Sequence, residues 1–386
     1  MKLGFLFNTP FVEYDNKYYS VNLTREFWEN RYLHFFDEIV VVGRVKHVKE
    51  NPGATMARSD MENVKFCCIE EEKGTSSYFG KKVNKFIEET IADCDAVICR
   101  NWWGTNVCRK LKKPYMIEVI TNVWDSLWYH SNKGKIAAVP NYLLQRRAVR
   151  KAPFVLYVSK FFLQEKYPTR GISCGCPDVW LEKPEFEVLN RRINKIRSLG
   201  EDCVTLGMIG ANSVGYRGHD TLLKAVAKLR KDGTNCRVRF LGGGNPSRWE
   251  KMSEDLGISD FVSFDGSLPH GVEVLNWIDD IDILVMPTRA ESLGRAVIEA
   301  MSRGCPVLGT IETGIREQIG SDCLFHAGDC AAIVQKVEYM ISDKSYMEYC
   351  AQENFYRSYK YSNAETDRIR NAFYKEFKDY ALRAQE

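Results

Sequence analysis

The chain has 386 residues, of which 45% are hydrophobic and 27% are charged, and its formal net charge is +3. This length is enough for two or three domains with sizeable cores, and the composition is ordinary for a globular protein. The small net charge does not point to a nucleic-acid partner, and no apolar run approaches the 18 residues that a membrane-spanning helix needs.

Residues 1–178 alternate between predicted strands and predicted helices. We expect strands at 3–7, 38–42, 64–69, 96–100, 115–120 and 154–159. We expect helices at 23–36, 81–92, 142–150 and 161–167. Alternation at this spacing predicts a mostly parallel sheet with helices on both faces. Residues 179–202 are charged and lack strand character, so we interpret them as a linker between domains.

A second α/β series occupies residues 203–360. We expect strands at 204–209, 238–241, 262–265, 283–287 and 307–310, and helices at 221–231, 249–256, 272–278, 295–302, 330–342 and 345–356. A long amphipathic helix at 364–384 closes the chain. The predicted fold class is therefore α/β, with two Rossmann-like domains and a cleft between them.

One strand–turn–helix–strand stretch in the second series contains the main candidate site. The apolar strand at 283–287 is followed by a turn over 291–294 and then by a helix. The turn lies at the carboxyl end of a parallel strand, where ligands bind in open α/β sheets. Gly294 permits close approach of a backbone, and the N–H groups at a helix start suit phosphate. Glu291 and Glu299 flank this turn at a spacing of eight residues.

These residues carry a resemblance. Glu291-x7-Glu299, followed by Ala300-Met301-x-x-Gly304-x-Pro306-Val307, resembles the nucleotide-sugar signature of the retaining GT-B glycosyltransferases of family 4. The resemblance implies two Rossmann-like domains that face each other across a cleft, with the C-terminal helix (361–386) crossing back to the first domain as a strap. The alternative interpretation is a plain βαβ unit whose two glutamates face solvent.

The same resemblance implies roles for the residues of the turn. It assigns Glu299 to the ribose hydroxyls of the donor and Glu291 to the hydroxyls of the donor sugar. It assigns backbone contacts with sugar and phosphate to Ser292, Leu293 and Gly294.

A second glycine turn follows the strand at 204–209. Gly210 and Gly215 resemble a Walker loop, but no Gly-Lys-Ser/Thr follows, so a P-loop is excluded. A glycine turn with a fork-shaped guanidinium near a helix start suits a diphosphate, which assigns Gly210, Asn212 and Arg217 to the donor. The family usually has lysine at the position of Arg217, and arginine keeps that charge. The family often has arginine at the position of Ala211, where the side chain of this chain offers no phosphate contact. The alternative for Arg217 is a solvated surface arginine.

Two further segments resemble donor-contacting parts of the family. Gly243 belongs to a glycine turn after the strand at 238–241, and Leu268 follows the strand at 262–265, where it would pack on the nucleobase.

The residues that would bind the acceptor belong to the first domain and are harder to predict. The family often has a histidine after the strand at 115–120, but this chain has none at the strand end, so Asp125 is the substitute candidate for contacting a sugar. The rival role for Asp125 is a helix N-cap. The aromatic side chains of the segment 9–19 either stack on sugar rings or pack over the cleft.

Two D-x-D sequences, at 280–282 and at 93–95, resemble the metal site of a different glycosyltransferase fold. Both precede an apolar strand instead of following one, so their carboxylates lie away from the ligand edge. We therefore expect no metal and no cofactor.

A basic cluster, Arg146-Arg147-x-x-Arg150-Lys151, is either a solvated helix face or a patch for an anionic membrane surface. The thirteen cysteines lack zinc-type spacing and indicate reduced thiols in a cytoplasmic protein. Peripheral association with the inner face of the plasma membrane stays open.

The sequence and the resemblance together predict a metal-independent, retaining hexosyltransferase-type enzyme. Its expected donor is a nucleotide diphosphate sugar, with uridine preferred on family frequency alone. Its expected acceptor is a saccharide or lipid-linked saccharide in surface polysaccharide synthesis. The alternatives are a nucleotide-sugar 2-epimerase of the same fold and a non-catalytic nucleotide-sugar-binding protein.

Overall fold

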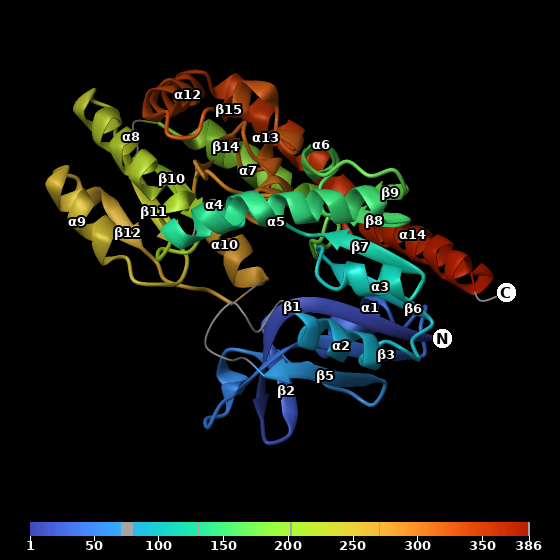
Figure 1. Cartoon of the computed structure of the whole chain (residues 1–386). Helices are drawn as coiled ribbons and strands as arrows, with labels where there is room; N and C mark the ends of the chain where they lie inside the picture. The colour runs from blue at the N-terminus through green and yellow to red at the C-terminus, as the bar shows by residue number, and fades with distance from the viewer. Residues whose placement is uncertain (71–79, 130, 201–202, 270, 385–386) are drawn as a thin grey trace.

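The computed structural model describes residues 1–70, 80–129, 131–200, 203–269 and 271–384, and it contains two separate sheets (Figure 1). Every strand of the first sheet comes from residues 2–175, and every strand of the second comes from residues 204–325. We refer to the two sheets with their helices as the first and the second domain.

The first sheet has nine strands among the described residues. Its parallel part runs in the order β5-β3-β1-β6-β7-β8-β9, and β2 and β4 extend it in antiparallel pairs beside the far end of β1. The strand bounds are β1 Lys2–Tyr14, β2 Lys17–Ser20, β3 Glu38–His47, β4 Ala57–Arg58, β5 Val64–Glu70, β6 Ala96–Arg100, β7 Tyr115–Val119, β8 Phe154–Tyr157 and β9 Ile172–Gly175. The helix bounds are α1 Arg25–Arg31, α2 Lys81–Thr90, α3 Thr105–Lys110, α4 Val123–Trp128, α5 Asn132–Lys151 and α6 Phe162–Lys166.

The segment 9–19, whose aromatic side chains we expected in or over the cleft, is instead part of a β-hairpin. β1 continues to Tyr14 and turns into β2 through Asp15 and Asn16, which have φ angles of 53° and 55°. Short Asp and Asn side chains tolerate this left-handed conformation. Phe11 is fully buried in the first core and Tyr18 stacks on Phe66, so these aromatic rings pack internally. They are therefore not available to stack on a sugar.

The second sheet is parallel throughout, in the order β12-β11-β10-β13-β14-β15. Its strands are β10 Val204–Ile209, β11 Cys236–Leu241, β12 Val262–Phe264, β13 Ile283–Met286, β14 Val307–Thr310 and β15 Leu324–Phe325. The helices are α7 Phe186–Ser198, α8 His219–Lys231, α9 Ser247–Asp255, α10 Val272–Asp280, α11 Arg295–Ser302, α12 Cys330–Ser342 and α13 Lys344–Ser358. The order reverses beside β10 and β13, which places the turns after these two strands at the usual ligand position of a doubly wound sheet.

Three sequence predictions differ from the structure. The expected linker contains α7, whose Leu189, Ile193 and Ile196 belong to the core of the second domain. Charged residues on the other face of α7 hid this helical period. Helix α5 begins at Asn132, ten residues before the predicted start. Pro140 lies inside this helix, and because a proline usually indicates a helix boundary, it favoured a later start. The helix predicted at 23–36 is limited to α1.

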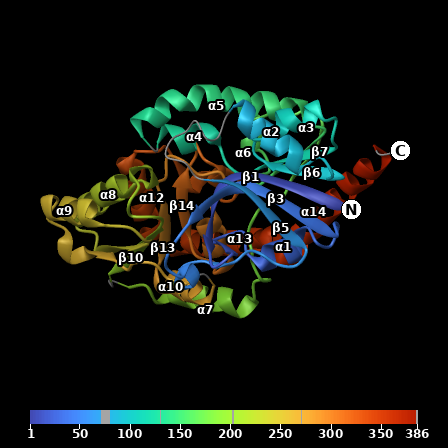
Figure 2. The ribbon, with the colours of Figure 1, turned by 60° about the horizontal axis from the view of Figure 1, so that its bottom comes forward.

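The last helix, α14 (Asn363–Arg383), returns to the first domain as expected. It starts beside the second domain and ends near the N-terminus (Figures 1 and 2). Phe373, Tyr374 and Phe377 are buried in a core cluster with α1 and the first sheet. The hydroxyl group of Tyr374 donates a hydrogen bond to Glu118 on β7 at 2.6 Å. These contacts join α14 to the domain that is distant from it in sequence.

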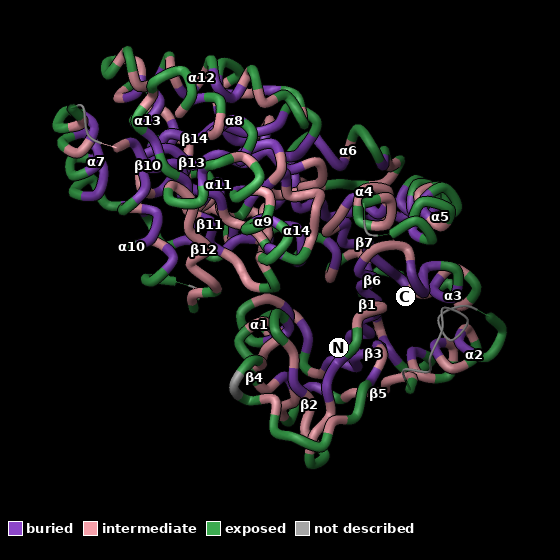
Figure 3. The backbone as a smooth tube through the Cα atoms, turned by 90° about the vertical axis from the view of Figure 1, so that its left-hand side faces the viewer, coloured by how far each residue is buried: buried purple, intermediate pink, exposed green. Residues whose placement is uncertain are grey.

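Both sheets are covered on each face by helices, so the central strands are buried and the exposed residues lie mainly on helices, loops and outer strands (Figure 3). No helix within the described residues is long and apolar enough to cross a membrane.

Candidate active site

Two adjoining cavities lie at the carboxyl ends of the strands, where the domains meet. The second-domain cavity, about 420 Å³, is lined only by residues of that domain, including Gly210, Gly243, Leu268 and Glu299. The interdomain cavity, about 480 Å³, is lined by both domains. The residues that line both cavities are Arg217, Glu291, Leu293 and Arg295. These shared residues place the predicted turn at the junction of the two spaces.

The turn between β13 and α11 is held in place by Gly314. The Gly314 N–H donates a hydrogen bond to the carbonyl oxygen of Glu291 at 2.9 Å. A Cβ atom at Gly314 would lie 2.2 Å from the carbonyl oxygen of Ser292, so only glycine permits this approach. The Glu291 carboxylate also accepts a hydrogen bond from the Ser292 N–H at 3.1 Å. Backbone contacts therefore fix the Glu291 main chain and one of its carboxylate oxygens.

Arg217 and Glu291 form an ion pair across the junction. Nη1 of Arg217 lies 2.6 Å from Oε2 of Glu291, and both side chains are mostly buried. Burial lowers the pKa of Arg217, but the Glu291 carboxylate more than compensates, so the net pKa lies above its ordinary value. Arg217 is therefore a largely buried, paired cation at the junction of the cavities and not a solvated surface arginine.

The turn that carries Arg217 is anchored by Arg289. The Arg289 guanidinium forms a two-pronged ion pair with Asp220, with N–O distances of 3.1 and 2.9 Å. Its Nη1 atom also donates to the carbonyl oxygen of Gly215 at 3.2 Å, and its backbone N–H donates to Tyr216 at 2.7 Å. Arg289 therefore connects the Arg217 turn to the segment that leads into Glu291.

Glu299 lies in the second turn of α11 and lines the second-domain cavity. Burial raises the pKa of its carboxyl group, and nearby Arg295 opposes the shift. Its carboxylate has no hydrogen-bond partner among the described residues. A largely buried carboxylate that faces a cavity without a partner is suited to accept hydrogen bonds from a ligand.

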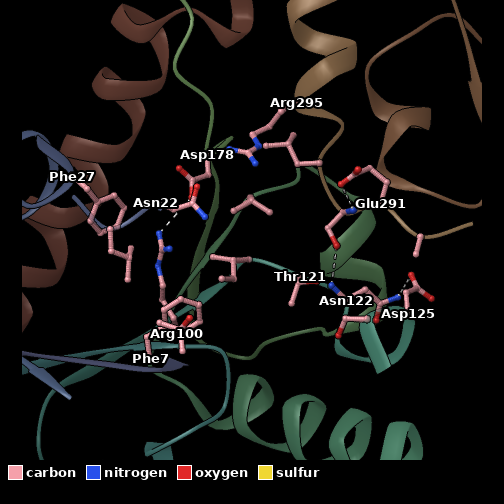
Figure 4. A pocket seen from close by; sticks show the side chains of 18 of the residues that line it. Phe7, Asn22, Phe27, Arg100, Thr121, Asn122, Asp125, Asp178, Glu291 and Arg295 are labelled. Atoms are coloured by element: carbon pink, nitrogen blue, oxygen red, sulfur yellow. Dashed lines mark hydrogen bonds and ion pairs between the residues drawn. The ribbon is translucent and has the colours of Figure 1, made fainter. Parts of the chain in front are cut away.

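Asp125 lines the interdomain cavity from α4. The N-cap of α4 is Asn122, whose side chain accepts a hydrogen bond from the Trp124 N–H, so the rival N-cap role for Asp125 is wrong. Asn122 also donates a hydrogen bond to Asp125 at 2.6 Å (Figure 4). Burial raises the pKa of Asp125, and this hydrogen bond opposes the rise.

The two domains also meet at Ser292. Its Oγ atom accepts a hydrogen bond from the backbone N–H of Asn122 at 2.8 Å (Figure 4). The residue predicted to contact the donor thus touches, through its side chain, the loop that leads to Asp125.

A charged cluster that no sequence motif indicates lines the far side of the interdomain cavity. Arg31 and Arg100 both pair with Asp178, and Arg100 also pairs with Glu118 at 3.0 Å. Burial raises the pKa of Asp178, but the two arginines hold it well below its ordinary value. Arg295 forms no ion pair with any described residue, and its guanidinium lies on the Asp178 side of the cavity (Figure 4). Of these residues, only Arg100 could have been identified from the sequence, because it ends an apolar strand.

Most predicted donor residues converge on these cavities, but one does not. Gly210, Gly243, Leu268, Leu293, Gly294 and Glu299 line the second-domain cavity. Asn212 is buried away from both cavities: it donates to the carbonyl oxygen of Gly242 at 2.7 Å and bonds His219 at 3.1 Å. Its amide therefore braces two glycine turns, because both of its polar ends are already used within the protein.

The D-x-D sequences lie at the opposite edge of the sheets. A carboxylate oxygen of Asp282 accepts a hydrogen bond from the Thr205 N–H at 2.8 Å, and Asp95 accepts one from the Lys2 N–H at 2.6 Å. Both aspartates fix the amino ends of strands.

Comparisons with known proteins agree with this geometry. Residues 205–356 match the family model described as Glycosyl transferases group 1. Protein CapJ of Staphylococcus aureus is 29% identical over 367 residues, covering 92% of this chain and 90% of CapJ.

Two solved structures share the fold over nearly the whole chain. Anabaena HepE in complex with UDP and glucose superposes with a TM-score of 0.65 at 14% identity, covering 97% of this chain and 99% of HepE. WaaG, a glycosyltransferase involved in lipopolysaccharide biosynthesis, superposes with a TM-score of 0.62 at 15% identity, covering 95% of this chain and 99% of WaaG. Residues 205–356 therefore match the group 1 glycosyl transferases, and the whole chain is similar in sequence to CapJ and has the two-domain GT-B fold of these solved structures.

Proposed function

We propose that this protein is a retaining glycosyltransferase that moves a sugar from a UDP-sugar to a saccharide or lipid-linked saccharide during surface polysaccharide synthesis. The single observation that carries this proposal is the junction of two cavities at the Arg217–Glu291 pair. One cavity is built wholly from the second domain and suits a nucleotide, and the other opens between the domains and suits an acceptor.

In the proposed donor complex, the diphosphate lies against Gly210, Arg217 and the first turn of α11. Gly210 lets the Arg217 side chain lie close to its turn, since a Cβ atom there would lie 3.2 Å from that side chain. The N–H groups at the start of α11 and the Arg217 guanidinium supply positive charge. Glu299 accepts hydrogen bonds from the ribose hydroxyls, and Gly243 and Leu268 contact the nucleobase end.

In the proposed reaction, an acceptor hydroxyl oxygen forms a bond to the anomeric carbon as the bond from that carbon to the diphosphate oxygen breaks. A phosphate oxygen takes the acceptor proton, and attack occurs on the leaving-group face, which retains the anomeric configuration. Negative charge grows on the diphosphate, so preorganised cationic and N–H groups lower the barrier without a metal. Glu291 holds the donor sugar, and Asp125 contacts the sugar from the first domain.

The proposed donor and the proposed role in polysaccharide synthesis follow by analogy with the structural relatives. HepE was solved with UDP and glucose, and WaaG is a glycosyltransferase involved in lipopolysaccharide biosynthesis. We propose a cytoplasmic enzyme that builds a surface polysaccharide, with peripheral association at the inner face of the plasma membrane.

The test is thermal unfolding with UDP, GDP, ADP and their sugar conjugates. A ligand at 100 times its dissociation constant stabilises a protein by about 2.7 kcal/mol, which is readily measured. We expect the uridine series to raise the midpoint, Glu299→Ala to abolish the shift, and Glu254→Ala, an exposed acid on α9, to preserve it. No shift with any nucleotide diphosphate would contradict the proposal. Turnover of the donor only in the presence of an acceptor distinguishes the transferase from an epimerase and from a binding protein.

A further inference from the structure

Helix α5 has an exposed face of unusual composition. Its twenty residues include no Asp or Glu. Ile136 is 80% exposed and Leu143 is 57% exposed, and Val139 and Leu144 are also exposed. Residues three and four apart share one face of a helix, so 136, 139, 143 and 144 form one outward apolar stripe. The buried residues of α5, including Ala138, Ala148 and Val149, lie on the inner side.

The same face becomes strongly cationic toward the C-terminal end of α5. A groove of about 410 Å³ there is lined by Leu143, Arg146, Arg147, Arg150, Lys151 and Arg170. No acidic residue lines this groove, and none of its cations forms an ion pair with a described residue. The outward side of α5 stands at the edge of the molecule, where its exposed residues are drawn in green (Figure 3). We call this combined apolar and basic face the α5 surface.

We propose that the α5 surface binds an anionic lipid bilayer. Clustered unpaired cations need an anionic partner, and an apolar stripe beside them needs an apolar one, and an anionic bilayer interface supplies both on one plane. A protein partner fits less well, because the exposed apolar stripe is wholly aliphatic, whereas the centres of protein interfaces are enriched in aromatic residues and Met. At 1.5 Å per residue, α5 is about 30 Å long, so it offers an extended contact to a flat surface.

The position of the α5 surface also bears on the acceptor. A Cβ atom at Gly134, in the first turn of α5, would lie 2.2 Å from the carbonyl oxygen of Leu127 on α4, so the two helices pack without a gap. Helix α4 carries Asp125 and Ser126, which line the interdomain cavity. The apolar end of the α5 surface is therefore the end nearest this cavity. This step rests on the proposed function: an acceptor anchored in the bilayer would meet the cavity beside α4.

The experiment is sedimentation of the full chain with vesicles of phosphatidylcholine alone or with added phosphatidylglycerol. We expect binding only to the anionic vesicles and weaker binding at high salt. The variant Arg146→Glu, Arg147→Glu, Arg150→Glu should bind at least about a hundredfold more weakly, since each cation near an anionic surface contributes roughly 1 kcal/mol. The matched control, Arg191→Glu, Lys231→Glu, Lys251→Glu, makes the same charge change at exposed sites of the second domain and should bind normally.

A second variant separates insertion from simple charge attraction. Ile136→Ser, Leu143→Ser, Leu144→Ser keeps every charge and should also lose most vesicle binding. Equal binding of this variant, or of the charge-reversed variant, would overturn the proposal. If the wild-type chain binds no vesicles and elutes as a dimer on gel filtration, and the variants elute as monomers, the α5 surface instead contacts a second copy of the chain. The thermal shift with UDP, measured without vesicles, tests folding and donor binding separately, so failure of the α5 surface and failure of the proposed function give different results.

Discussion

Nη1 of Arg217 lies 2.6 Å from Oε2 of Glu291, and this contact joins two turns that are 74 residues apart in sequence. The partners predicted from sequence were separate, a diphosphate for Arg217 and a sugar for Glu291. In the structure each is the other's partner, and the pair lies where the two cavities adjoin. Binding of an anionic donor beside Arg217 would therefore weaken its attraction to Glu291 and release that carboxylate for sugar hydroxyls.

Replacement of Arg217 tests this exchange. Arg217→Ala should weaken UDP binding roughly 10- to 100-fold, because a hydrogen bond to a charged group contributes about 1.5–3 kcal/mol. Arg217→Lys should lose less UDP affinity, since lysine keeps the positive charge but lacks the forked geometry of the guanidinium group. Isothermal titration calorimetry measures both affinities, with Arg191→Ala, at an exposed position of α7, as the control. Unchanged affinity in Arg217→Ala would remove Arg217 from the donor site.

Glu299 should show a trade-off between stability and binding. Burial raises its pKa above the ordinary 4.5, so the ionised form costs stability in the folded protein. The carboxyl group destabilises the fold as pH rises through its raised pKa, and this cost vanishes below the pKa of the unfolded chain. Glu299→Gln should therefore melt higher than the wild type at pH 7, by roughly 1–3 °C, and equally at pH values below about 4.

The control for that comparison is Glu254→Gln, an exposed acid in the same domain, which should change the midpoint little at either pH. Glu299→Gln should at the same time bind UDP more weakly. A variant that is less stable than the wild type at pH 7 would show that the Glu299 carboxylate is held by a favourable contact.

The sequence predicted the fold and most of the second-domain cavity, because these depend on local patterns. Strand–turn–helix order places Gly210 at a strand end and Glu299 in the helix that follows a strand end, whatever the rest of the chain does. Asn212 shows the limit of this reasoning. Its position in the glycine turn was right, but whether its amide faces a ligand or the protein depends on Gly242 and His219, which are distant in sequence.

The first domain was less predictable for the same physical reason. The Arg31–Asp178–Arg100 cluster joins three segments that approach each other only after folding. The α5 surface was partly concealed by Pro140, which normally indicates a helix end but here lies on the exposed side of a continuous helix.

Asp125 is expected to act on transfer and not on donor binding. Asp125→Asn keeps the size of the side chain and removes its charge from the interdomain cavity. We expect kcat to fall about tenfold or more while the UDP dissociation constant stays unchanged, because Asp125 is outside the second-domain cavity. Asp279→Asn, at the opposite edge of the second domain, is the control. A matching loss of UDP affinity would place Asp125 in the donor site instead.

Arg289 is expected to position Arg217 without touching the donor. Its contacts with Asp220, Gly215 and Tyr216 fix the turn that carries Arg217. Arg289→Met should raise the donor KM about tenfold with a smaller change in kcat, and Arg289→Lys should recover part of the loss. Asp220→Asn should reproduce the Arg289→Met effect. If only the melting midpoint changes, the pair is structural and does not position the site.

Glu317 should control how firmly the two domains stay together. Its carboxylate accepts hydrogen bonds from the backbone N–H groups of Lys160 and Phe161, both at 2.6 Å, and from that of Phe162, at the start of α6 in the first domain. Charge-assisted hydrogen bonds of this kind are stronger than neutral ones. Glu317→Gln removes the charge that strengthens these hydrogen bonds. It also replaces one carboxylate oxygen by an NH2 group, which is itself a donor and cannot accept from a backbone N–H.

We therefore expect Glu317→Gln to increase the radius of gyration in small-angle X-ray scattering and to speed hydrogen exchange at 160–163. UDP affinity should be preserved, because Glu317 lines neither cavity, while the acceptor KM should rise several-fold since the interdomain cavity needs both walls. Glu312→Gln, an exposed acid five residues earlier, should leave all four quantities unchanged. Unaltered scattering together with a raised acceptor KM would mean that Glu317 shapes the acceptor side directly, since domain closure would then be independent of its charge.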